Sequence, residues 1–358
     1  MANVLDLRRR IRSVRNTRQI TKAMKMVSAA RLRRAQERAV SARPYAAMLA
    51  SVLESLKRRA DIYDPETGEV RHPLLLTRPE KRILLVVVSG DKGFAGAFNA
   101  NIFKAAANFM TENREKEIDL EAIGRKGRDL FRRRYPAARF SEGGEEHQRR
   151  ERQRASAIEV LESPTAPLDR VNYDVVREVA EEIIELYTRE EIDAAYLVYN
   201  EFKSVIQQRV VVERVLPILS LSMQEIERAE EPTLEQRERA AEAALSAGVS
   251  LYPHEAEAAQ KQLEDEAKNF GTAEVDYIYE QPPQEIFADV LPRYVASQLY
   301  HAVLESIAAE HAARMTAMDS ATNNASDMID AYTLQMNRVR QAAITKEIIE
   351  IVSGAAAL

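Results

Sequence analysis

The last residues of the chain, Ala321 to Leu358, read ATNNASDMIDAYTLQMNRVRQAAITKEIIEIVSGAAAL. Together with the residues just before it, this stretch repeats small and apolar residues at alternating steps of three and four: Met318, Ala321, Ala325, Met328, Tyr332, Gln335, Val339 and Ala342. A strict seven-residue repeat requires a left-handed supercoil with a second helix, and an Ala-rich seam lets that helix approach closely. The sequence therefore predicts a coiled coil here, with an apolar tip that something must cover: Ile348, Ile349, Ile351, Val352 and Ala355–Leu358.

The N-terminal segment has the matching length to be the partner helix. From Ala2 to about Leu56 it holds no Gly and one Pro, Pro44. As one continuous helix, it forms a rod of roughly 80 Å. Its apolar residues step by three and four in two groups: Val4, Leu7, Ile11 and Val14, then Ile20, Met24 and Val27. We expect the two ends of the chain to pair as an antiparallel coiled coil.

The middle of the chain alternates strand and helix patterns. Apolar strands are predicted at 82–90, 118–124, 194–200 and 207–218, and helices near 95–110, 126–134 and 173–188. Such alternation is typical of a mostly parallel, doubly wound sheet. The predicted fold class is thus α/β, a long antiparallel coiled coil of the terminal helices with a Rossmann-like domain between them. The expected division is 1–58 N-terminal helix, 59–76 linker, 77–222 Rossmann-like domain, 223–284 acidic insert and return strand, and 285–358 C-terminal helix.

Charge is distributed unevenly along the chain. Residues 1–43, the basic arm, contain 13 Lys and Arg against Asp6 and Glu37, whereas the whole chain carries −5. The segment 223–285 holds 16 acidic and 5 basic residues, with two helical-looking stretches separated by AGVSLYPHE (247–255). It is interpreted as a solvated acidic hairpin or flap, or as a disordered loop. A basic arm indicates an acidic partner: nucleic acid, a membrane surface or an acidic protein face.

Composition narrows the function classes. Cysteine is absent, which excludes disulfides and thiol chemistry. The longest apolar run, Ile83–Val88, is far below the roughly 20 residues that span a bilayer, and no apolar segment follows Arg8–Arg10 as in a signal peptide. We therefore expect no direct membrane insertion.

No catalytic, metal or cofactor site is predicted. The turn GDKGFAGAFN places glycines at relative positions one, four and seven, whereas the dinucleotide fingerprint needs one, three and six, so a tight strand-to-helix turn is the better interpretation. The five histidines are scattered, and the carboxylate pairs lie on expected solvated faces. The arm contains no aromatic residue before Pro44, unlike single-strand binders, although a duplex-phosphate binder remains open.

Three stretches carry a resemblance to a known family. IRSVRNTRQITKAMKMVSAARLRRA (Ile11–Ala35), AARMTAMDSATNNASDMI (Ala312–Ile329) and NRVRQAAITKEIIEIVSGAAA (Asn337–Ala357) resemble the gamma subunit of the F-type ATP synthase, and SGDKGFAGAFNANIFK (Ser89–Lys104) is similar to that family's strand-to-helix turn. The resemblance implies a non-catalytic rotor shaft that couples ion-driven rotation, such as proton transport, to ATP synthesis or hydrolysis in catalytic beta subunits. It implies no cofactor.

The same resemblance implies partners and a location. The shaft would rise through a ring of alpha and beta subunits, whose apolar sleeve encloses the tip, while the α/β domain would contact the epsilon subunit and the membrane rotor ring of c subunits. The complex would lie peripherally at the cytoplasmic face of the cell inner membrane. The implied partner-binding residues lie on both shaft helices: Arg9, Arg12, Lys22, Met24, Lys25, Arg31, Arg33, Arg340, Gln341, Thr345, Glu347, Ile348 and Val352.

Two alternatives stay open on sequence alone. A basic coiled-coil nucleic-acid-binding protein would use the same arm, and a homodimeric scaffold would use the same seam. Neither accounts for the apolar tip. The acidic segment lies roughly where photosynthetic relatives carry a regulatory insert, but a thiol switch there is impossible without cysteine.

Overall fold

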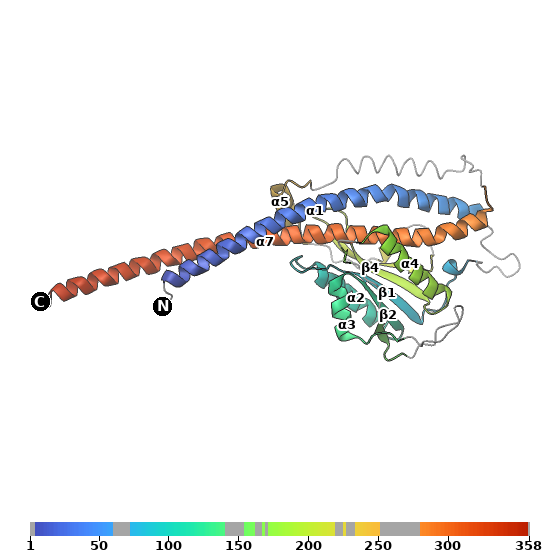
Figure 1. Cartoon of the computed structure of the whole chain (residues 1–358), viewed down its shortest axis with the longest axis horizontal. Coiled ribbons are helices and arrows are strands. Elements are labelled where there is room, and N and C mark those ends of the chain that lie inside the picture. The colour runs from blue at the N-terminus through green and yellow to red at the C-terminus, as the bar shows by residue number, and fades with distance from the viewer. Residues whose placement is uncertain are drawn as a thin grey trace.

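Two long helices and one mixed sheet make up the chain (Figure 1). The computed structural model describes residues 4–59, 72–139, 154–161, 167–168, 171–218, 225–226, 233–250 and 280–356. Helix α1 (Val4–Arg59) and helix α7 (Pro283–Ala356) run side by side, and the α/β domain lies against the α7 side of the pair. This arrangement confirms the predicted fold class.

Each long helix has one proline in its interior, Pro44 in α1 and Pro292 in α7, which itself begins at Pro283, and both helices continue through the interior proline. Proline removes one backbone donor and crowds the preceding turn, so a helix tolerates it where neighbours hold the segment. Leu291, next to Pro292, is fully buried in the cluster that also contains Leu53 of α1. Leu49 and Ala50, closer to Pro44, pack partly buried against it. Packing on the neighbouring helix and the sheet thus holds the proline-containing segments helical.

The sheet has the strand order β3-β2-β1-β4-β5-β6. Its strands are β1 (Arg82–Val88), β2 (Glu117–Ile123), β3 (Ile158–Val160), β4 (Ala194–Phe202), β5 (Gln208–Leu216) and β6 (Glu225–Ile226). The first four pair in parallel, as the alternating pattern predicts. Strands β5 and β6 are antiparallel, because β5 returns from β4 through a short turn that permits only a hairpin.

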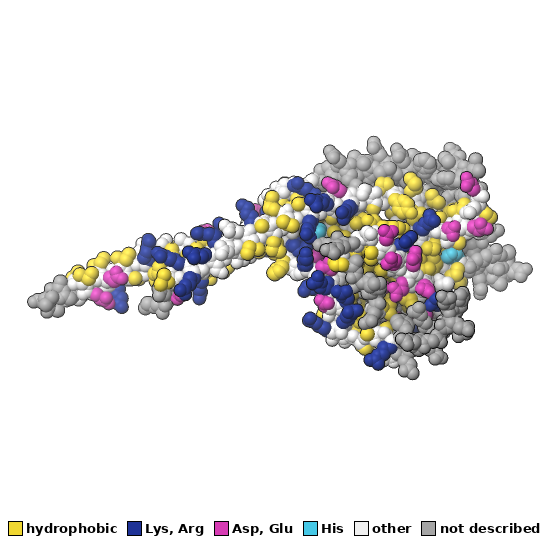
Figure 2. All heavy atoms as spheres, in the orientation of Figure 1, with side chains coloured by type: hydrophobic (Ala, Val, Ile, Leu, Met, Phe, Trp, Pro, Cys, Tyr) yellow, Lys and Arg dark blue, Asp and Glu magenta, His cyan; other side chains and the backbone are white. Residues whose placement is uncertain are grey.

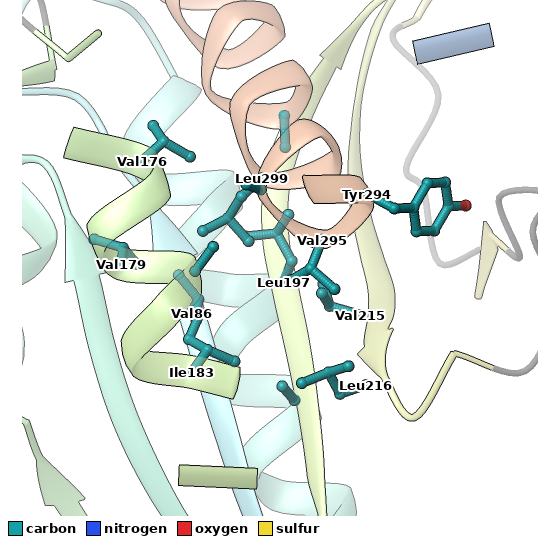
Figure 3. Close-up of a cluster of buried hydrophobic side chains, with 14 of the residues drawn as sticks. Val86, Val176, Val179, Ile183, Leu197, Val215, Leu216, Tyr294, Val295 and Leu299 are labelled. Atoms are coloured by element: carbon teal, nitrogen blue, oxygen red, sulfur yellow. The ribbon is translucent and has the colours of Figure 1, made fainter. Parts of the chain in front are cut away.

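Successive residues of β1 serve opposite faces of the sheet. Leu84, Val86 and Val88 enter one cluster with α4 (Tyr173–Thr188) and the first half of α7. In that cluster, Val86 and Leu197 of the sheet lie between the α4 and α7 side chains (Figure 3). Ile83, Leu85 and Val87 enter the other cluster with α2 (Phe98–Glu112) and α3 (Arg125–Arg134). The sheet is therefore buried on both sides, as parallel strands require.

The acidic segment differs from the predicted solvated flap or disordered loop. Its described part contains β6 and helix α5 (Leu234–Ser246), whose Ala243 and Ala244 are fully buried. The short helix η1 (Pro73–Leu75) lies in the predicted linker and is bonded to the end of the sheet, where Ile218 N donates to Leu74 O. Short β3, β6 and η1 were not predicted. The second helical stretch expected after residue 250 lies outside the described residues, and the domain boundaries stay a prediction.

Candidate partner-binding surface of the coiled coil

The two long helices meet along a continuous seven-residue repeat. The α1 seam consists of positions that are buried or half-buried: Leu7, Ile11, Val14, Arg18, Thr21, Lys25, Ser28, Leu32, Ala35 and Ala39. The α7 seam has the same spacing: Met315, Met318, Thr322, Ala325, Ile329, Tyr332, Met336 and Val339. This geometry is that of the predicted left-handed supercoil.

Part of the predicted seam is wrong. On α1, Ile20 and Val27 are 60% and 54% exposed, and Met24 is half-buried. On α7, Ala321 is half-buried, Met328 is 45% exposed, and Gln335 and Ala342 are exposed. The repeat does not pause after Val14 but continues through polar residues. The apolar pattern therefore assigned to the seam several residues that lie on the outer surface of the coiled coil.

Polar residues bridge the middle of the seam. Thr322 Oγ1 donates to Thr21 Oγ1 at 2.8 Å, and Arg18 lies 3.4 Å from Ser326 Oγ. Lys25 forms an ion pair with Asp319, and the two side chains are only 9% and 13% exposed. These pairs step in opposite directions along the two helices, so they fix the antiparallel register.

The expected basic residues fall into two groups. Arg9, Arg12, Lys22 and Arg31 are exposed on α1, and Lys and Arg side chains line this part of the coiled coil (Figure 2). Lys25 and Arg33 instead bind within the chain. Lys25 Nζ donates to Ser246 Oγ at 2.6 Å in addition to its pair with Asp319, and Arg33 Nη2 donates to Gly248 O at 2.5 Å. Sequence reasoning missed this second role, since no pattern in the sequence pairs α1 with α5.

The end of α7 runs beyond the start of α1 (Figure 1). Every residue from Arg340 to Ser353 is exposed, including the expected contact residues Arg340, Gln341, Thr345 and Glu347. The apolar side chains there are exposed by about half or more: Ile344 49%, Ile348 55%, Ile349 58%, Ile351 71% and Val352 63%. The described chain thus leaves this end uncovered.

The polar groups of the glycine-rich turn after β1 form hydrogen bonds with other residues of the chain. Gly90 N donates to Asn99 Oδ1 at 2.9 Å, and Asp91 Oδ1 accepts from Arg125 N at 2.9 Å. A Cβ at Gly90 would lie 2.6 Å from Glu310 Oε1 of α7. That carboxylate also accepts from Arg314 at 2.5 Å. The turn therefore joins β1 to α2, α3 and the coiled coil.

The described residues contain no group of three or more His, Asp or Glu side chains with the geometry of a metal site. Among the described helices, none combines the length and apolarity that a membrane span needs.

Two long paired helices with polar bridging residues, exposed basic side chains and an exposed apolar end define a class of protein: a shaft subunit of a larger assembly. The family model described as ATP synthase matches residues 3–358. The chain is 46% identical over 357 residues to the ATP synthase gamma chain of Solibacter usitatus, covering 100% of this chain and 99% of that one. It is 40% identical over 360 residues to that of Pelotomaculum thermopropionicum, covering 100% of both.

The chain belongs to the ATP synthase gamma chain family. Its role is that of the rotor shaft, and the nucleic-acid-binding and scaffold alternatives are not favoured. A solved structure of the Tetrahymena thermophila mitochondrial ATP synthase central stalk and c ring is similar at 21% identity and a TM-score of 0.47, covering 84% of this chain and 99% of that one. A likeness of that size adds nothing to the assignment.

Proposed function

We propose that this chain turns within a ring of alpha and beta subunits and that ATP chemistry takes place in the beta subunits. The exposed end of α7 carries this proposal. At 100° per residue, its five large apolar side chains cover an arc of about 160° of the helix surface. One partner helix covers a narrower stripe, whereas an enclosing sleeve covers the whole arc. Apolar contacts without directional bonds also leave the shaft free to rotate.

The flank of the shaft supports contacts of a second kind. Arg9, Arg12, Lys22 and Arg31 present positive charge to acidic loops of the ring, with Met24 packed among them. Exposed ion pairs contribute only about 0–1 kcal/mol each, so the attraction is spread over several residues. Arg340, Gln341, Thr345 and Glu347 form polar contacts with ring loops next to the tip. Arginine there is suited to a bidentate carboxylate contact.

The α/β domain takes the other end of the assembly. We propose that it contacts the epsilon subunit and the c ring and that the complex lies at the cytoplasmic face of the membrane, with no contact to nucleic acid. Purification of the native complex through a tag on this chain tests these assignments. We expect alpha, beta, epsilon and c subunits to be recovered together in the membrane fraction. Recovery without alpha and beta subunits, or salt-sensitive DNA binding by the full chain, would contradict the proposal.

A further inference from the structure

Helix α5 packs on the side of the shaft through small residues. Its start is secured by a capping box between Thr233 and Gln236. Ala244, Ala247 and Val249 enter the cluster that contains Leu32 of α1 and Met315 of α7. The chain after α5 thus closes over the seam at the level where the shaft passes the sheet.

Two basic residues of α1 bind the C-terminal end of α5. Arg33 Nη2 donates to Ala247 O at 3.2 Å and to Gly248 O at 2.5 Å. Lys25 Nζ donates to Ser246 Oγ. The carbonyl end of a helix carries partial negative charge, so cations stabilise it. Arg33 and Lys25 therefore donate to oxygen atoms at the end of α5, as they would to the carboxylates of an acidic partner.

Gly248 shapes this end of the helix. It adopts φ +65°, and Val249 N donates to Ala244 O at 2.9 Å, the hydrogen bond that closes a Schellman motif. A Cβ at Gly248 would lie 3.2 Å from Arg33 Nη2. The left-handed conformation and the close guanidinium both favour glycine.

The docking of α5 is weaker than the packing of the other helices. Its buried residues are mostly alanines, whereas its two leucines, Leu234 and Leu245, are 77% and 67% exposed. Burial of alanine contributes little free energy, because the gain scales with the apolar area removed from water. Contacts of exposed Arg33 are also screened by salt.

We infer that α5 is a reversible latch that competes with the acidic surface of the catalytic ring for Arg33. The competition rests on the proposed function, which assigns Arg31 and the other exposed basic residues of α1 to acidic ring loops and which is extended here to exposed Arg33. The latch itself rests on the contacts within this chain. A guanidinium that holds two carbonyls at the end of α5 has fewer donors left for a carboxylate. Engagement of the ring therefore releases α5, and docking of α5 weakens the contact with the ring.

Hydrogen exchange of the α5 amides, 233–250, tests the latch in the free full-length chain. Gly248→Ala weakens the latch from the α5 side and leaves every shaft residue unchanged, while Arg33→Gln weakens it from the shaft side. We expect both to speed exchange by about tenfold, the equivalent of one lost hydrogen bond to a charged group. The controls are Gly93→Ala, with nothing within 4 Å of its Cβ, and Arg34→Gln, the exposed neighbour of Arg33; neither changes α5 exchange. Unchanged exchange in both latch variants would overturn the latch.

The same measurement on the assembled complex tests the competition. We expect the α5 amides of the wild-type chain to exchange about as fast in the complex as those of Gly248→Ala do in the free chain. Equal protection of α5 in the free and assembled wild-type chain would overturn the competition. Failure of the chain to assemble with alpha and beta subunits would instead contradict the proposed function, and it leaves the result on the free chain intact.

Discussion

Lys25 shows how a charged residue serves a coiled-coil seam. Its ion pair with Asp319 and its hydrogen bond to Ser246 lie where an apolar residue is the usual choice. A buried polar pair adds little net stability, but it specifies register because any slip leaves a charge without its partner.

Removal of one charge of this pair therefore destabilises the shaft. We expect Lys25→Met to lower the free energy of unfolding of the full chain by about 3 kcal/mol, because Asp319 stays buried without its cation. The double variant Lys25→Met/Asp319→Leu recovers most of the loss. Chemical denaturation measures both, with exposed Lys22→Met as the control. A single variant as stable as the control would contradict this role of the pair.

Tyr187 gives the α/β domain a dependence on alkaline pH. Its hydroxyl donates to Leu76 O, and burial raises the pKa of the phenol to about 12. The pKa in the folded chain then exceeds that in the unfolded chain, so the stabilisation is complete below pH 10 and is lost as pH rises towards 12.

We expect the unfolding free energy of the wild-type chain to fall more steeply than that of Tyr187→Phe between pH 10 and pH 12. Below pH 10 the variant is less stable by about 1 kcal/mol, for the lost hydrogen bond. Denaturation at a series of pH values measures the two slopes. Parallel slopes would show that the phenol titrates alike in both states.

At the scale of the element, we expect the end of α7 to matter for the assembled complex and not for the stability of the free chain. Arg340 and Gln341 are exposed on a helix that extends past its partner. We expect Arg340→Ala/Gln341→Ala to change the unfolding free energy of the free chain by less than about 0.5 kcal/mol, as for other surface substitutions. ATP hydrolysis by the assembled complex should fall severalfold. The control is Lys346→Ala, whose ion pair joins only Glu350 of the same helix turn. Hydrolysis equal to that of the control would leave these two residues as ordinary solvated positions.

The long helices were predictable from the sequence, but their contact was predictable only in part. Val14 and Val339 follow the apolar rule and were placed correctly on the seam. Thr21 and Lys25 are on the seam although they are polar, because each finds a partner on α7. Ile20 is apolar yet exposed, so hydrophobicity alone assigns it to the wrong face. Pairing between helices far apart in the sequence decides such positions.

The first helical stretch of the acidic segment was predicted, but its docking on the shaft as α5 was not, for a related reason. Its charge indicates a solvated segment, and its docked face consists of alanines, which give a weak hydrophobic signal. The strand β5 was predicted, but its antiparallel direction was not. Alternation of strands and helices carries no information about the direction of a strand that directly follows another strand.

At the scale of the whole molecule, α5 links stability of the chain to its retention in the complex. Replacement of 233–250 by a flexible linker uncovers Leu32 and Ala35, so we expect a lower free energy of unfolding for the isolated chain. The same variant lacks the competitor for Arg33, and it should therefore stay in the complex to a higher salt concentration than the wild-type chain. Denaturation and salt-dependent dissociation measure the two effects. If the variant were less stable and also dissociated from the complex at a lower salt concentration than the wild-type chain, the competition would be contradicted.

The pairing of the first and last helices also dictates an order of events during synthesis. Helix α1 leaves the ribosome before the strands of the sheet, and its partner α7 follows them. One face of the sheet also stays incompletely covered until α7 is made, because Val295 and Leu299 of α7 complete the cluster on Val86 and Leu197. A nascent chain of this protein therefore presents a long basic helix and a half-covered sheet until α7 has left the ribosome. During that interval molecular chaperones have an apolar surface to protect.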